Sequence, residues 1–291
     1  MRIAVLGPIT KDIIIVNGVK NTYIGGVPYY VAKALKALGA EVKVFGTYSE
    51  EDKDLIENNF KDIELKHFPV EGTIIHQLSY NTDDPDHREV VVPQYDPNIF
   101  RPDENLLKEI KKFDYIILGP LYFENIPFEV FERLKDCNLA LNNFGLFTYF
   151  EDGKPVRKNP DNLSKVAPFL KYLFLDEEEI LFAAQKENIE EAAKYFLYIG
   201  VRNVIVTRGS RGSIIFTPNH IIEIPAFPPI ELVDPTGAGD TYMAAFIYGT
   251  SLFNDIKKVG DFAAMSATMV IEKGGVFDGN IKKVHERLSN I

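Results

Sequence analysis

The stretch VDPTGAGDTYMAAFIYG, residues 233–249, decides the fold of this chain. After the apolar Val233 it contains Gly237, Ala238 and Gly239 in succession, followed by an acid, Asp240. The run of small and aromatic residues that comes next is typical of a helix. The first amide groups of a helix lack intrahelical partners and carry partial positive charge, so a bare glycine-rich helix start attracts phosphate. The stretch therefore predicts a helix that begins at a phosphate site.

Asp240 conflicts with that prediction at first sight, because a carboxylate in the first turn would repel the same phosphate. The conflict disappears if Asp240 accepts the proton of a substrate hydroxyl while the amides of residues 237–239 hold the phosphoryl group being transferred. The alternative is a tight strand-to-helix turn in which Asp240 is an ordinary first-turn acid, favoured by the helix dipole. The spacing alone leaves both interpretations open.

Composition limits the function classes. The chain has 291 residues, 46% of them apolar, and a formal net charge of -10, so a broad basic face for duplex nucleic acid is not expected. No run of about eighteen apolar residues appears, and the N-terminal RIAVLG is strand-like rather than typical of a signal peptide. We therefore expect a cytoplasmic protein without membrane or nucleic-acid partners.

Short apolar runs alternate with amphipathic stretches along most of the chain. Strands are predicted at residues 2–7, 41–46, 115–120, 138–142 and 203–209, and helices at 28–39, 51–60, 127–135, 189–200, 239–249 and 255–272. Strands of Val, Ile and Leu separated by helices are typical of a mainly parallel sheet covered on both faces. We expect one α/β domain over residues 1–291.

Residues 63–95 interrupt this alternation with three strand-like pieces, IELKHF, TIIHQLSY and REVVV, and no helical pattern between them. Together with strands within about 12–25, they predict a small antiparallel sheet that acts as a lid; the alternative is that they are edge strands of the main sheet. His76, Gln77 and Asn81 are then candidates to contact substrate, or solvated strand residues. An exposed flap also predicts a homodimer formed through the lid.

The opening stretch, taken in full, resembles the C-terminal signature of the ribokinase/PfkB family of carbohydrate and nucleoside kinases, D-T-x-G-A-G-D followed by a helix. VLGPITKDIIIVNG resembles the family's opening strand with its substrate-binding acid, and the segment from GGVPYY onward resembles its di-glycine signature. DEEE, residues 176–179, falls where the family has N-x-x-E, and VTRGSRGSIIF resembles its T-x-G-x-x-G stretch. All five segments occur in family order.

The resemblance implies a doubly wound α/β fold with a small β lid, and transfer of the γ-phosphoryl group of ATP to an alcohol. The acceptor is then a sugar, a cyclitol such as inositol, or a nucleoside, and the absence of a dense basic cluster favours an unphosphorylated one. The implied site residues are Asp12, Gly25 and Gly26 for the acceptor; Asp240 with Gly237, Ala238 and Gly239 for catalysis; Glu179 and Asp176 for Mg²⁺; and Thr207, Arg208, Gly209, Gly212 and Thr236 for the nucleotide.

Two residues depart from the family pattern. Tyr30 stands where the di-glycine signature usually has Asn, which predicts an aromatic wall at the acceptor site and a ring-shaped acceptor. Asp176 replaces the Asn of N-x-x-E; it keeps an oxygen ligand for Mg²⁺ and adds charge, although DEEE also reads as an ordinary acidic helix start.

Two other functions compete with the kinase. A non-catalytic sugar- or nucleotide-binding sensor of the same fold is the alternative, against which Asp240 and Glu179 argue. A nicotinamide-dependent dehydrogenase is excluded because no G-x-G-x-x-G follows the first strand.

Overall fold

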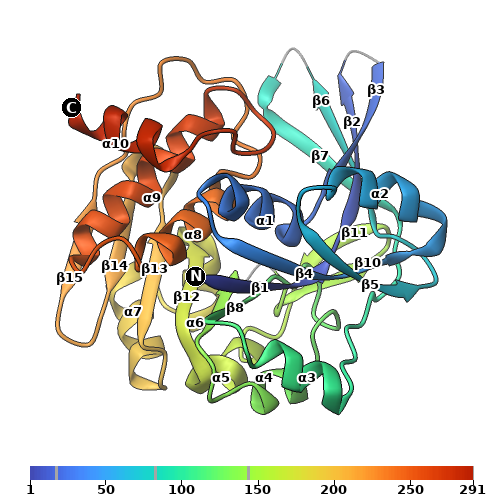
Figure 1. Ribbon diagram of the computed structural model, residues 1–291, viewed down its shortest axis with the longest axis horizontal. Helices are drawn as coiled ribbons and strands as arrows, with labels where there is room; N and C mark the ends of the chain where they lie inside the picture. The colour runs from blue at the N-terminus through green and yellow to red at the C-terminus, as the bar shows by residue number, and fades with distance from the viewer. Residues whose placement is uncertain (17–18, 82–83, 143–144, 291) are drawn as a thin grey trace.

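The computed structural model describes residues 1–16, 19–81, 84–142 and 145–290. Among these residues, nine strands form the main sheet in the order β15-β14-β13-β12-β9-β8-β1-β4-β5 (Figure 1). Their bounds are β1 (Arg2–Pro8), β4 (Glu41–Ser49), β5 (Glu64–Val70), β8 (Tyr115–Leu118), β9 (Leu139–Asn142), β12 (Leu170–Asp176), β13 (Asn203–Thr207), β14 (Ser213–Phe216) and β15 (Ile221–Ile224). Neighbours from β5 to β13 pair in parallel, whereas β14 pairs antiparallel with both β13 and β15 and so runs against the other strands of this sheet. The predicted mainly parallel α/β fold is confirmed.

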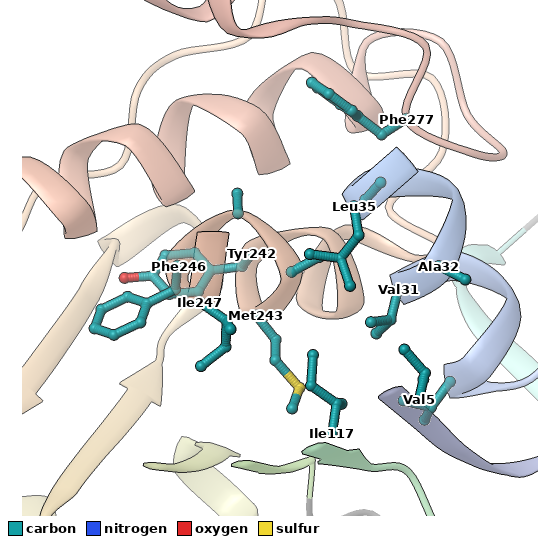
Figure 2. Packing of buried hydrophobic residues seen from close by; sticks show 14 of the residues in the cluster. Val5, Val31, Ala32, Leu35, Ile117, Tyr242, Met243, Phe246, Ile247 and Phe277 are labelled. Carbon is teal, nitrogen blue, oxygen red and sulfur yellow. The ribbon is translucent and has the colours of Figure 1, made fainter. Parts of the chain in front are cut away.

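Helices cover both faces of this sheet, each over its own apolar cluster. One face carries α1 (Val27–Ala37), α2 (Lys53–Asn59), α8 (Ala238–Gly249), α9 (Ile256–Ile271) and α10 (Ile281–Ser289); the other carries α3 (Glu104–Ile110), α4 (Phe128–Arg133), α5 (Asn162–Val166), α6 (Glu177–Ala184) and α7 (Ile189–Tyr198). Figure 2 shows α8 beside α1, with the Met243 side chain directed at Ile117 of β8; Val31 and Leu35 of α1 belong to the same apolar cluster. The small and aromatic residues of α8 are buried nearly all round, which explains its weak amphipathic pattern.

A second sheet in the order β3-β2-β6-β7 projects from the main body, and we call it the lid sheet. Its strands are β2 (Thr10–Val16), β3 (Val19–Gly25), β6 (Ile75–Asn81) and β7 (Asp84–Gln94). The expected antiparallel pairing is found for β2–β3 and β6–β7, but it is wrong for β2–β6, which pair in parallel. The side chain of Asn81 lies outside the described residues.

The strand-like piece IELKHF, predicted with the lid, belongs to the main sheet as β5, where it pairs in parallel with β4. The short helix α2 between β4 and β5 supplies the crossover that a parallel pair requires. β5 lies at the sheet edge and is only half-buried, so its sequence lacks the continuous apolar run of the central strands.

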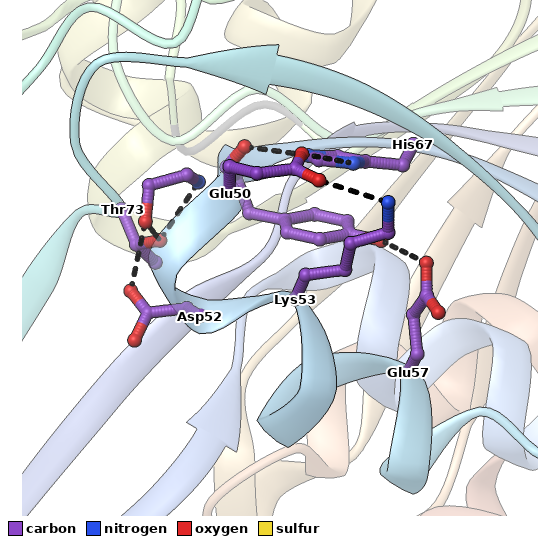
Figure 3. A network of polar contacts seen from close by, with 8 residues as sticks. Glu50, Asp52, Lys53, Glu57, His67 and Thr73 are labelled. Carbon is purple, nitrogen blue, oxygen red and sulfur yellow. Dashed lines mark hydrogen bonds and ion pairs between the residues drawn. The ribbon is translucent and has the colours of Figure 1, made fainter.

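A polar network holds the base of the lid sheet against the body (Figure 3). Lys11 of β2 forms an ion pair of 2.6 Å with Asp52, and Ser49 Oγ donates to the same carboxylate at 3.1 Å. Thr73, just before β6, donates to Ser49 Oγ at 3.0 Å, and the His67 ring stacks on Tyr48 with centroids 3.9 Å apart. These contacts fix the beginning of β2 and thereby the position of its next residue, Asp12.

Candidate functional site

A cavity of about 820 Å³ lies between the lid sheet and the carboxyl ends of the parallel strands. Its lining includes Asn142, Asp176 and Thr207, the last residues of β9, β12 and β13. The lid sheet contributes Asp12, Ile14, Tyr23, His76, Leu78 and Val90. Ligands of open α/β sheets bind at this edge, so the topology itself marks the cavity as the candidate site.

The start of α8 borders this cavity and carries no side-chain cap. Gly237, the residue before the helix, has φ 76 and no side-chain cap is present. A Cβ atom on Gly237 would lie 2.6 Å from Tyr30 Cδ1, so glycine is required here by both conformation and contact. Within the described chain, no hydrogen bond occupies the amide of Gly239 or Asp240, and a Cβ on Gly239 would meet nothing within 4 Å. The helix therefore presents the open amides of Gly239 and Asp240 to the cavity. Gly237 and Ala238, predicted to act with them, do not line it, and the Ala238 amide donates to the Pro235 carbonyl at 3.1 Å.

Asp240 faces the same cavity from the first turn of α8. Its Oδ1 accepts a hydrogen bond of 2.7 Å from Asn142 Nδ2. Burial raises the pKa of Asp240 to about 7, while the bond from Asn142 acts in the opposite direction. A carboxylate whose pKa lies near neutrality can both accept and release a proton at working pH, which suits a general base.

Sequence reasoning missed Asn142. It lies 98 residues from Asp240 along the chain, and it ends a strand that was predicted only for its apolar residues. The available signal was a polar amide at the carboxyl end of a buried strand, the edge where the site residues of such sheets gather.

Asp176 and Glu179 line the cavity from the start of α6, where they form a capping box. The Asp176 carboxylate accepts the Glu179 amide at 2.7 Å, and Glu179 Oε2 accepts the Asp176 amide at 2.9 Å. Burial, and next the charge of Asp176, raise the pKa of Glu179. One oxygen of each carboxylate thus serves the helix, and the described residues contain no group of three or more acids, histidines or cysteines arranged to hold a metal alone.

Asp12 occupies the lid side of the cavity. Its Oδ1 accepts a hydrogen bond of 2.9 Å from Thr10 Oγ1 and lies 3.3 Å from His76 Nδ1. A Cβ on Gly25 would lie 2.0 Å from Asp12 Oδ2, so the bare backbone there makes room for the carboxylate. Gly26, with φ 88, is the N-cap residue just before α1, and unlike Gly25 it lines the cavity.

Tyr30 of α1 lines the cavity between the two halves of the site. Burial and then the charges of Asp12 and Asp240 raise the pKa of its hydroxyl. The ring of Tyr29 meets it edge-on, with centroids 5.4 Å apart. Tyr30 is thus an aromatic wall that reaches from the acid on the lid to the glycine turn of α8.

The predicted nucleotide residues are only partly brought together. Thr207 and Thr236 line the cavity, whereas Arg208, Gly209 and Gly212 form the turn between β13 and β14 and do not. Gly212 has φ 79, and its Cβ would lie 2.1 Å from the Ile224 carbonyl oxygen, so this glycine serves the turn. Lys273, Gly274 and Gly275, which sequence reasoning missed, line the same end of the cavity from the loop after α9.

Comparison with known families agrees with this arrangement. The family model described as pfkB family carbohydrate kinase matches residues 10–283. The chain belongs to the PfkB family. Among curated PfkB relatives, a nucleoside kinase of Methanocaldococcus jannaschii is 32% identical over 43% of this chain and 41% of its own length. A cytidine kinase of Thermococcus kodakarensis is 30% identical over 40% of this chain and 43% of its own length. The match thus spans less than half of each relative.

Solved structures named as ribokinases or ribokinase-family kinases share the fold over nearly the whole chain. One is a pyrophosphate-dependent kinase of the ribokinase family in complex with a pyrophosphate analogue and myo-inositol. It has a TM-score of 0.82 at 22% identity, and the match covers 98% of this chain and 99% of that one. A putative ribokinase II from E. coli in complex with ATP and Mg²⁺ has a TM-score of 0.79 at 19% identity, with 100% of this chain and 99% of that one covered. Among the described residues, no helix has the length and apolar character needed to cross a membrane.

Proposed function

We propose that this PfkB-family protein transfers the γ-phosphoryl group of ATP to a hydroxyl of a small, polyhydroxylated acceptor. The observation that carries the proposal is the pairing, in one cavity, of an uncapped helix start with an acid of raised pKa: the open amides of α8 suit a phosphate, and Asp240 suits a hydroxyl proton. The relatives named as nucleoside and cytidine kinases support the same reaction class. A non-catalytic sensor needs no such base, and is not favoured.

In this reaction Asp240 takes the proton of the attacking hydroxyl as the new O–P bond forms and ADP leaves. The bond from Asn142 fixes the direction of the Asp240 carboxylate. The open amides of Gly239 and Asp240 stabilise the negative charge of the phosphoryl group during transfer, whereas the Ala238 amide already donates to the Pro235 carbonyl at 3.1 Å. Asp12 holds hydroxyls of the acceptor across the cavity, so that only one hydroxyl reaches Asp240.

Mg²⁺ fits the donor end of the cavity. Magnesium sites of kinases commonly use one or two protein carboxylates together with substrate phosphates and water. Asp176 and Glu179 each keep one carboxylate oxygen outside the capping box, and both line the cavity. When bound there with the nucleotide, the ion would supply neutralisation of phosphate charge.

The acceptor end favours a ring without a phosphate group. Among the described side chains of the lid sheet, Asp12, His76 and Tyr23 give this end its polar groups. The remaining walls are largely apolar, with Tyr30, Leu78 and Leu121 among them. Within the described lining, the lysine or arginine present is Lys273, which lies at the other end and pairs with Asp278 at 2.6 Å. Among the residues whose side chains the structure describes, a phosphorylated acceptor would therefore find no lysine or arginine beside Asp12.

A phosphotransfer assay tests the proposal. Cytidine, adenosine, ribose and myo-inositol are each incubated with the protein and either Mg²⁺-ATP or Mg²⁺-pyrophosphate, and phosphorylated product is measured by mass. We expect product with at least one acceptor and ATP. Product formed with pyrophosphate but not with ATP would show that pyrophosphate, rather than ATP, is the phosphoryl donor. Binding of an acceptor without product from either donor would favour the non-catalytic sensor.

Closure of the lid sheet and dimerisation through it remain proposals. If the lid closes, amide hydrogen exchange in β2 and β6 should slow when an acceptor and a non-hydrolysable ATP analogue bind together. Unchanged exchange in both strands would contradict closure. Sedimentation that shows only monomer at assay concentration would contradict the dimer.

A further inference from the structure

A chain of hydrogen bonds runs from the body of the protein, through the lid sheet, to the acid of the acceptor site. His76 of β6 is its central member: Nε2 lies 3.1 Å from Tyr122 Oη, and Nδ1 lies 3.3 Å from Asp12 Oδ1. His76 lines the cavity and stands beside Asp12 in the register of the parallel pair β2–β6. The imidazole thus bridges the body and the acid.

The direction of these bonds follows from the chemistry of the three groups. A carboxylate only accepts, so the Nδ1 of His76 carries the proton that it shares with Asp12. In a neutral imidazole Nε2 then accepts, and the Tyr122 hydroxyl donates to it. Tyr122 is fully buried, so its hydroxyl needs such a partner.

The body end of the chain is rigid. Asn125 Oδ1 accepts the amides of Leu121 and Tyr122 at 2.8 and 2.7 Å, and both Asn125 and Tyr122 are fully buried. The ring of Tyr95 packs edge-on against Tyr122, with centroids 4.9 Å apart. Tyr122 therefore provides a fixed point to which the lid is tied through His76.

The acid end is arranged asymmetrically. Thr10 and His76 both reach Oδ1 of Asp12, and no hydrogen bond from the described residues reaches Oδ2. Oδ2 lies over the bare backbone of Gly25. One oxygen of Asp12 is therefore held by the protein and the other is left for the acceptor.

We propose that His76 is a positioning residue of the acceptor site, which holds Asp12 Oδ1 against Tyr122 so that Oδ2 is presented to the hydroxyls of the acceptor. The inference rests on the proposed kinase function, but it concerns acceptor binding rather than phosphoryl transfer. His76 acts through Asp12, so its removal matters only while Asp12 is present.

A double-mutant cycle tests this role with cytidine and myo-inositol as acceptors. His76→Phe keeps a ring and removes both hydrogen bonds; we expect the acceptor KM to rise roughly tenfold, with kcat and the ATP KM within about twofold. In an Asp12→Ala background the same substitution should change the acceptor KM less than about twofold. Tyr122→Phe, which removes only the distant hydroxyl, should raise it roughly threefold. Thr22→Ala, exposed on β3 outside the cavity, is the matched control.

Either of two results would overturn the proposal. An acceptor KM unchanged in both His76→Phe and Tyr122→Phe would show that the chain of bonds does not position Asp12. An equally large rise in the Asp12→Ala background would show that His76 binds the acceptor directly. Calorimetric titration of the same variants with both acceptors measures the acceptor Kd for each member of the double-mutant cycle and needs no turnover. A wild type that binds an acceptor but forms no product would therefore contradict the proposed function and not this inference.

Discussion

The helices α6 and α8 both begin at the cavity with acids in their first turn, yet their ends are completed in opposite ways. In α6 the acids serve the helix: Asp176 and Glu179 exchange hydrogen bonds with each other's amides. In α8 the start is a glycine without a side-chain cap, and Asp240 takes a distant partner, Asn142. Acidic residues at a helix start thus have different uses, and the hydrogen-bond partner shows which use applies.

The largest expected effect comes from Asp240→Asn. Asparagine keeps the size of the side chain but accepts no proton, so kcat should fall about 10²- to 10⁴-fold, or roughly 3 to 5.5 kcal/mol of barrier, with ATP still bound. If Asp240 were only a helix-start acid like those of α6, the change would cost about 1 kcal/mol of stability or less and leave turnover intact. Turnover, ATP binding and melting temperature measured on one preparation separate the two; full activity would remove the catalytic assignment.

The stability of this variant also has an expected pH dependence. Burial raises the folded-state pKa of Asp240 to about 7, so the folded protein holds a proton that the unfolded chain releases at lower pH. The contribution of Asp240 to stability is then fully present below its ordinary pKa and is lost as pH rises to about 7. We expect wild type to lose stability relative to Asp240→Asn over that window, as measured by urea unfolding at about pH 4.5 and about pH 8. A difference between the two proteins that stays constant with pH would contradict the raised pKa.

Asn142→Leu tests the partner that distinguishes α8 from α6. Because the bond from Asn142 lowers the pKa of Asp240, its loss should raise that pKa further and keep the base protonated to higher pH. The acid limb of the profile of kcat/KM against pH should move upward. Activity at a given pH on that limb should fall roughly tenfold for each pH unit by which the limb moves, and the profiles should converge at high pH. A uniform loss at all pH values would show that Asn142 only orients the carboxylate.

The contrast between the two helix starts also shows what sequence could predict. The sequence predicts the role of Asp240 because its motif is local and contiguous. It predicts the parallel sheet because buried strands are continuous apolar runs. Asn142 was missed because its importance depends on a contact across the sheet. The edge strand β5 was assigned to the lid because half-burial weakens its apolar pattern. Gly212 belongs to a motif, but its close contact with the backbone of β15 explains it without a nucleotide.

Tyr30→Asn tests the wall that rests on the glycine turn of α8. The substitution introduces an amide near Asp12 and removes the aromatic surface. The ratio of kcat/KM between ring acceptors and an open-chain polyol should therefore change by about tenfold, the effect of one lost aromatic contact. The ATP KM should change less than about twofold. Because a Cβ on Gly237 would approach the Tyr30 ring to 2.6 Å, a large rise in the ATP KM would instead show that the ring supports the turn itself.

The smallest effect is expected at Asp176, where the capping role and the proposed Mg²⁺ role can be separated by choice of substitute. Asp176→Ala removes the acceptor for the Glu179 amide and should cost about 1 kcal/mol of stability, whereas Asp176→Ser keeps a good N-cap and should stay within about 0.5 kcal/mol of wild type. Both variants lack the carboxylate. If that carboxylate helps to hold Mg²⁺, both should need the same several-fold higher Mg²⁺ concentration for half-maximal rate. If only the alanine variant needs more Mg²⁺, the cause is the lost helix cap and not the lost carboxylate. The start of α6 would then, unlike that of α8, have only a structural role.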